Sequence, residues 1–124
     1  MGKEVLLVAD DPSARGGLAR LLRSAGHEVR EAASANELLD ALFPGKAGCL
    51  VLDAGIPGLL GGDLQAELEA RDARMLVIVV NAGDDPETRR KAEAMHAVGF
   101  FRKPVDDVAL LDAVGWALER NQAG

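Results

Sequence analysis

The segment that decides the fold reads Val5-Leu6-Leu7-Val8-Ala9-Asp10-Asp11-Pro12. Its first five residues form an unbroken apolar run, which is typical of a strand with both faces buried. Asp11 can accept hydrogen bonds from the free amides that begin a helix, and Pro12 suits the first helical position. A buried strand that passes directly into a helix is the building unit of a parallel sheet covered by helices, so the fold depends on whether this unit recurs.

The same unit recurs four more times. Further apolar runs predict strands at residues 27–32, 49–52, 75–80 and 98–102. The first helix ends at Gly26, the second is capped by Ser34 with Glu37 three positions later, and the third opens at Asp63. The last two helices are expected over 86–95 and 106–120, and glycine- and proline-rich loops at 44–48 and 55–62. The expected fold class is α/β: a flavodoxin-like, doubly wound sheet of five parallel strands in the order 2-1-3-4-5, with five helices, forming one domain of residues 1–124.

Composition agrees with an ordered globular domain and argues against several functions. Apolar residues make up 48% of the 124 residues and charged residues 27%, which is enough of each for a core and a solvated surface. The net charge of −6 argues against a nucleic-acid-binding surface. No apolar run approaches the roughly 18 residues that span a bilayer, so we expect no membrane contact. Cys49 is the only cysteine, which excludes an internal disulfide and a thiolate zinc cluster and fits a cytoplasmic location.

Polar residues stand where the predicted strands end: Asp10 and Asp11, Asp53, Asn81 and Lys103. Ligands of such sheets bind beyond the carboxyl ends of the strands, so we expect these side chains to lie close together. Carboxylate oxygens suit Mg²⁺, and a lysine across the cleft can hold a phosphate as a point charge. The sequence contains no G-x-x-x-x-G-K loop, the usual cradle for a nucleotide.

The whole chain resembles the receiver domains of two-component response regulators. Four segments carry the resemblance: Leu6-Leu7-Val8-Ala9-Asp10, Leu50-Val51-Leu52-Asp53-Ala54-Gly55-Ile56-Pro57-Gly58, Val79-Val80-Asn81-Ala82 and Phe100-Phe101-Arg102-Lys103-Pro104. The 43 positions from Asp10 to Asp53 and the 22 from Asn81 to Lys103 also match the family's spacing. Each segment alone is weakly informative, whereas four in order at these intervals are specific.

The resemblance implies a phosphoacceptor in phosphorelay signalling, a signalling module rather than an enzyme, with no effector domain in these residues. Asp53 would take a phosphoryl group from a histidine kinase or phosphotransfer protein, and Lys103 and the backbone of Ala82 would contact that group. Residue 81 normally carries a hydroxyl that closes onto the phosphoryl group, and Phe100 would be the aromatic residue that moves with it. Mg²⁺ would be bound by Asp10, Asp53 and the backbone carbonyl of Gly55, with Asp11 as a candidate further ligand.

Two positions depart from the family pattern. The alignment of the first helix and the distance to the acceptor place Ala9 and Asp10 at the usual acidic pair, so one carboxylate is missing and weaker Mg²⁺ binding is expected. Asp11 is then an extra acid, best interpreted as the cap of the first helix. Asn81 stands where Thr or Ser is usual. Its amide can donate to a phosphoryl oxygen, but a turn residue without phosphate contact is an equally open interpretation.

The last helix is expected to present a tryptophan to solvent. At about 100° per residue, Val108, Leu111, Gly115 and Leu118 share one apolar stripe, and Trp116 lies roughly 140° from its centre. An exposed tryptophan favours a partner surface, through which the last helix and the fifth strand would contact a second copy or an effector domain. Packing of Trp116 against a neighbouring loop is the competing interpretation.

Three functions fit these residues. The first is the phosphoacceptor. The second is a degenerate receiver that acts by protein contact without phosphorylation, which Ala9 and Asn81 favour. The third is a small phosphatase of similar fold with Asp53 as nucleophile, which Gly55 argues against, because a second aspartate would be needed there as general acid.

Overall fold

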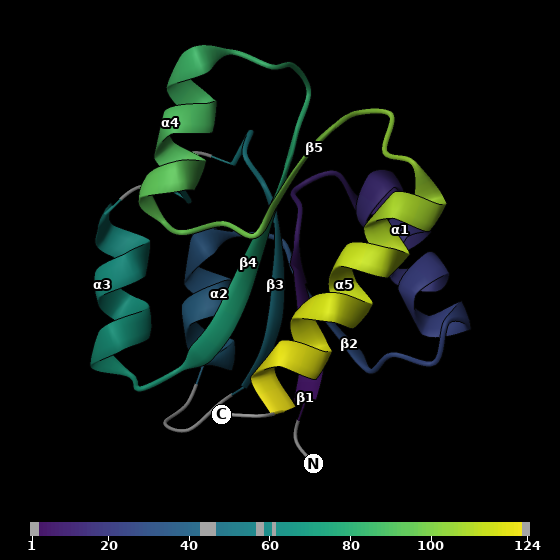
Figure 1. Cartoon of the computed structure of the whole chain (residues 1–124), viewed down its shortest axis with the longest axis horizontal. Helices are drawn as coiled ribbons and strands as arrows, with labels where there is room; N and C mark the ends of the chain where they lie inside the picture. Colours follow the sequence, from purple (N-terminus) through teal and green to yellow (C-terminus); the bar gives the residue numbers. More distant parts are fainter. Residues whose placement is uncertain (1–2, 43–46, 57–58, 61, 123–124) are drawn as a thin grey trace.

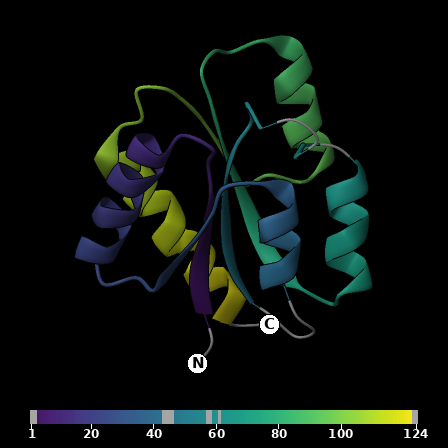
Figure 2. The same cartoon turned by 180° about the vertical axis from the view of Figure 1, so that it is seen from behind.

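The computed structural model, which describes residues 3–42, 47–56, 59–60 and 62–122, is a three-layer α/β sandwich (Figure 1). The chain alternates strands and helices throughout: β1 (Lys3–Val8), α1 (Pro12–Ser24), β2 (Val29–Ala32), α2 (Ala35–Ala41), β3 (Ala47–Asp53), α3 (Gly62–Ala70), β4 (Arg74–Asn81), α4 (Pro86–Ala94), β5 (Gly99–Arg102) and α5 (Asp107–Gln122). Helices α1 and α5 cover one face of the sheet and α2, α3 and α4 cover the other, as the view from behind also shows (Figure 2).

The sheet has the predicted topology. Its five strands are all parallel and lie in the order β2-β1-β3-β4-β5, which confirms the expected doubly wound arrangement. The predicted ends shift by one or two residues at most elements; β2, for example, begins at Val29 rather than at residue 27. Of the two predicted loops, residues 44–46 and 57, 58 and 61 lie outside the described residues, while Ala47 and Gly48 belong to β3.

Local side-chain hydrogen bonds fix the helix starts where the sequence predicts them. One carboxylate oxygen of Asp11 accepts from the backbone N–H of Ala14 at 3.1 Å, which makes Asp11 the cap of α1. Ser34 caps α2 by accepting from the N–H of Glu37 at 3.2 Å, and the Glu37 carboxylate accepts from the N–H of Ala33 at 2.8 Å. The capping-box prediction is therefore confirmed, with the return bond one residue earlier than in the usual pattern.

The central strands are buried on both faces, as their unbroken apolar runs predict. In β1, Leu6 and Val8 belong to the core under α2, α3 and α4, whereas Val5 and Leu7 belong to the core under α1 and α5. Cys49 lies in the second core, and its burial raises the pKa of the thiol to about 12, so it is an inert core residue as predicted. Among the residues that the structure describes, no helix combines the length and apolar character needed to cross a membrane.

The predicted apolar stripe of α5 is wrong, although the predicted exposure of Trp116 is confirmed. Leu110, Val114 and Ala117 are fully buried against the sheet, whereas Val108 is 68% exposed. The helix is apolar around much of its circumference, so the angular average does not identify which apolar side faces the sheet. Trp116 is 48% exposed.

A substitution at Gly48 tests the close approach of β1 and β3. Gly48 has φ +154°, and a Cβ there would lie 2.1 Å from the carbonyl oxygen of Glu4 on the paired strand. We expect Gly48→Ala to lower the free energy of unfolding, measured in urea, by about 2 kcal/mol or more, because two backbones would have to separate.

Gly115→Ala is the matched control. No atom lies within 4 Å of a Cβ built at Gly115 in the middle of α5. The extra methyl group should therefore raise helix propensity and stabilise the domain by about 0.5–1 kcal/mol. A Gly48→Ala protein as stable as the wild type would contradict the described β1–β3 contact.

Candidate phosphoacceptor site

The sheet brings Asp53 and Lys103 to one edge although they are 50 positions apart in the chain. Asp53 is the last residue of β3 and pairs in register with Val80 of β4. Lys103 directly follows β5, and its backbone N–H donates to the carbonyl of Asn81 at 2.8 Å, which extends the β4–β5 ladder by one residue. The peptide bond from Lys103 to Pro104 is cis.

The two carboxylate oxygens of Asp53 have different partners. Oδ1 accepts from the backbone N–H of Gly55 at 2.9 Å, and Oδ2 accepts from Nζ of Lys103 at 2.8 Å. The Asp53 side chain is 11% exposed and the Lys103 side chain 39% exposed. The carboxylate is thus held in one orientation, with a cation beside it and a narrow opening to solvent. These contacts confirm that the two residues converge, as their positions after β3 and β5 predict.

Asp10 and Asp11 differ in their surroundings. Asp10 follows the end of β1 and is exposed. Asp11 is exposed too, but one of its oxygens caps α1, so its role as a metal ligand stays a prediction. Within the described part of the chain, no three His, Cys, Asp or Glu side chains gather closely enough to hold a metal ion. Mg²⁺ usually takes one or two protein carboxylates and keeps several waters, so Asp10 and Asp53 are the carboxylates that could hold it here.

The position of the missing acid is apolar in the structure. Ala9 is 3% exposed, and its carbonyl accepts from Nη1 of Arg15 at 2.8 Å, while Nε of Arg15 pairs with Glu31 at 3.3 Å. Its side chain borders a cavity of about 20 Å³ that also reaches Asp53 and Lys103. Ala9 therefore contributes an apolar wall beside Asp53 rather than a further carboxylate.

Asn81 lies at the edge of the site, but its amide group points towards the loop between β4 and α4. It is 8% exposed, and Nδ2 donates to the carbonyl of Gly83 at 3.0 Å and to Oδ1 of Asp85 at 2.9 Å. Ala82 follows it at the end of β4, and its contact with a phosphoryl group stays a prediction. Asp85 caps α4, and the sequence does not indicate its contact with Asn81, because either side chain could instead bind water or another backbone group.

Phe100 is held by a residue that sequence reasoning missed. It is partly buried on β5 and packs against the core under α2, α3 and α4. The guanidinium of Arg89, on α4, lies 4.6 Å from the centre of its ring, and the same guanidinium pairs with Asp84 at 2.7 Å. The only sequence signal for this contact is a basic residue in the first turns of a helix that precedes β5.

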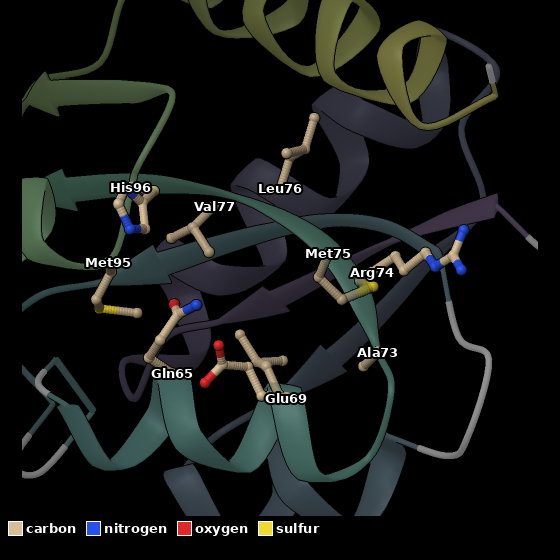
Figure 3. Close-up of a pocket in the computed structure, with 10 residues that line it drawn as sticks. Gln65, Glu69, Ala73, Arg74, Met75, Leu76, Val77, Met95 and His96 are labelled. Atoms are coloured by element: carbon tan, nitrogen blue, oxygen red, sulfur yellow. The ribbon is translucent and has the colours of Figure 1, made fainter. Parts of the chain in front are cut away.

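A larger cavity of about 260 Å³ lies away from these residues, along the amino-terminal half of β4. Figure 3 shows Gln65 and Glu69 projecting from α3 towards β4, with Met95 and His96 at one end of the cavity and Met75 near the other. His96 lines this cavity and follows the end of α4 with φ +59°, so its place at the helix end and its separation from Asp53 are as predicted.

The fold and the site together define a class of protein. A carboxylate at the carboxyl end of a central strand, paired with a lysine from the edge strand, forms the site of a doubly wound five-stranded domain. The model of the response regulator receiver domain family matches residues 5–115. The chain therefore belongs to this family, whose members are signalling modules of two-component systems.

Relatives of known sequence and structure agree. The chain is 40% identical over 117 residues to transcriptional regulatory protein FixJ of Azorhizobium caulinodans, covering 94% of this chain and 56% of that protein. It is 43% identical over 119 residues to nodulation protein W of Bradyrhizobium diazoefficiens, covering 95% and 52%. The structure superposes on response regulator StyR with a TM-score of 0.85 at 40% identity, covering 99% of this chain and 62% of that one. The chain thus spans about half the length of the curated relatives it matches.

The Asp53–Lys103 ion pair has a testable energetic consequence. Lys103→Ala would leave the mostly buried Asp53 carboxylate without its cation, so we expect the free energy of unfolding to fall by about 1–3 kcal/mol in a urea titration. Lys91→Ala is the matched control, because Lys91 pairs with Glu87 at 3.5 Å on an exposed face of α4. That substitution should change stability by less than about 0.5 kcal/mol. Equal effects of the two substitutions would show that the lysine does not neutralise Asp53.

Proposed function

We propose that this domain accepts a phosphoryl group on Asp53 from the phosphohistidine of a histidine kinase or phosphotransfer protein, in a Mg²⁺-dependent reaction. The observation that carries the proposal is the 2.8 Å contact between Oδ2 of Asp53 and Nζ of Lys103 at the carboxyl edge of the sheet. An anionic nucleophile beside a fixed cation can receive a phosphoryl group, whose added charge the cation offsets. Membership of the receiver family supports the same function.

The chain's own residues account for most of the transfer. The Gly55 N–H holds one oxygen of Asp53, so the carboxylate keeps one orientation towards an incoming donor. A carboxylate oxygen of Asp53 forms the new P–O bond while the P–N bond of the phosphohistidine breaks and the imidazole nitrogen keeps the electron pair. The ammonium group of Lys103 stays beside the oxygens and offsets the charge of the transferred group.

Mg²⁺ would be held by Asp10, Asp53 and the carbonyl of Gly55, with water completing its shell. When bound, it supplies neutralisation of the phosphoryl oxygens. Because Ala9 stands at one position of the usual acidic pair, this set carries less negative charge than the family pattern, and its affinity for Mg²⁺ should be correspondingly lower.

The domain would bind a phosphodonor protein at the Asp53 site and a second partner at a surface formed by α5 and β5. Trp116 is 48% exposed, and the guanidinium of Arg120 lies 5.2 Å from its ring, which gives α5 an aromatic contact surface. A second copy of the chain or an effector domain would bind there. The domain acts as an acceptor in cytoplasmic signalling and not as an enzyme that turns over a substrate.

Phosphorylation of the isolated domain tests the proposal. After incubation with Mg²⁺ and acetyl phosphate, the intact mass should rise by one phosphoryl group. When Mg²⁺ is chelated before the donor is added, no adduct should form. Asp53→Asn is the matched control, because it keeps the shape of the side chain and removes the nucleophile. It should give no adduct.

An unmodified wild-type mass, together with no effect of beryllofluoride on the protein, would contradict the phosphoacceptor function. That outcome would favour the interaction module that acts without phosphorylation, for which Ala9 and the hydrogen-bonded Asn81 are the supporting observations.

A further inference from the structure

The orientation of the Asn81 side chain is determined by its two hydrogen-bond partners. The Gly83 carbonyl and the Asp85 carboxylate are both acceptors without hydrogens, at 3.0 Å and 2.9 Å from the same amide nitrogen. Exchange of the amide oxygen and nitrogen would set an oxygen against two oxygens, so the NH₂ group must face them. An amide has two N–H bonds, and each has an acceptor here. No N–H of Asn81 is left for a phosphoryl oxygen.

Asp85 connects the end of β4 to the first turn of α4. While its Oδ1 accepts from Asn81, its Oδ2 accepts from the backbone N–H of Thr88 at 3.0 Å and from the Thr88 hydroxyl. The hydrogen bonds from the Thr88 side chain and from Asn81 are the main causes that lower the pKa of Asp85 from 3.8 to about 2. A lowered pKa means that these bonds add stability above the ordinary pKa and lose it only as the pH falls towards 2, so the contact is intact at neutral pH.

The rest of the β4–α4 loop (residues 82–85) is tied to β5. Both Nε and Nη2 of Arg89 donate to Oδ1 of Asp84, at 3.0 Å and 2.7 Å. The same guanidinium lies over Phe100, the residue at the family's mobile aromatic position. The loop, α4 and β5 therefore form one hydrogen-bonded and cation–π-linked unit before any group is attached to Asp53.

We propose that Asn81 and Asp85 form a latch that holds the β4–α4 loop and the start of α4 against the end of β4, and that phosphorylation of Asp53 does not open it. Asp85 is a positioning residue in this scheme, because it acts by orienting Asn81. The statement about phosphorylation rests on the proposed function; the latch itself does not.

The physical reason is that a phosphoryl group gains little from Asn81. To donate to it, the amide nitrogen must turn away from the loop, which gives up both of its present bonds. The bond to Asp85 is charge-assisted, so the new bond to the phosphoryl group only replaces it, and the Gly83 carbonyl loses its donor as well. Lys103 already provides a charged donor at the acceptor. A bound group shifts a conformational equilibrium only by its differential interaction with the two states, so the face formed by α4, β5 and α5 should keep one arrangement.

Hydrogen exchange of the unphosphorylated domain tests the latch. Asp85→Ser keeps a capping oxygen for the Thr88 N–H but is too short to reach Asn81. The amides of Thr88 and Arg89, which both donate to residue 85, should therefore exchange about tenfold faster than in the wild type. Thr88→Val is the matched control, since it removes the hydroxyl bond to Asp85 and leaves the bond from Asn81. It should exchange within about twofold of the wild type at those amides. Unchanged exchange in Asp85→Ser would overturn the latch.

The second arm uses protein phosphorylated with acetyl phosphate and Mg²⁺, with the adduct verified by intact mass. Phosphorylation should leave the exchange of residues 82–90 and the fluorescence of Trp116 unchanged in the wild type. Trp116 is the only tryptophan and the chain has no tyrosine, so the signal reports on α5 alone. Both readouts should respond in Asn81→Thr, whose hydroxyl does not bind two acceptors. A response of the phosphorylated wild type would overturn the uncoupling, whereas absence of any adduct would contradict the proposed function and leave the first arm to decide the latch.

Discussion

The ion pair between Lys103 and Asp53 is the contact on which the functional part of the structure depends. It joins the end of β3 to the end of β5 across β4, so it forms only when the three strands are parallel and in register. The pairing of Asp53 with Val80, and of the Lys103 backbone with Asn81, sets the height at which the two side chains meet. The hydrophobic core builds that register, since the strands are held between two layers of helices that bury both faces.

Two positions near this pair depart from the family pattern. One affects the charge available to a metal ion, and the other affects the β4–α4 loop. Ala9 gives the acceptor an apolar neighbour and a cavity of about 20 Å³, which reduces the charge available for a metal ion. Asn81 gives the β4–α4 loop a fixed anchor, because its amide is satisfied within the loop. In the proposed function, separate groups would therefore carry phosphoryl acceptance and the response of the β4–α4 loop, so a change in one would not require a change in the other.

Much of this could be predicted from the sequence. The unbroken apolar runs determine which strands are buried on both faces, and the positions directly after them predicted the meeting of Asp53 and Lys103. Caps such as Asp11 were predictable because they depend on contacts three residues away. The contact between Asn81 and Asp85 could not be predicted, because the Asn81 amide could bind solvent, a phosphoryl group or its own loop. Only the side-chain rotamer determines which of these it binds. The buried side of α5 was placed wrongly because apolar residues surround much of that helix, and the sheet selects Leu110, Val114 and Ala117.

The most direct test of the central claim is to identify the phosphorylated residue chemically. Borohydride reduces an aspartyl phosphate to homoserine, which is stable and can be located by peptide sequencing in a mass spectrometer. If the carboxylate held by Lys103 is the acceptor, domain treated with Mg²⁺ and acetyl phosphate and then with borohydride will contain homoserine at position 53 alone. Homoserine at Asp10 or Asp11, or at no position, would contradict the account.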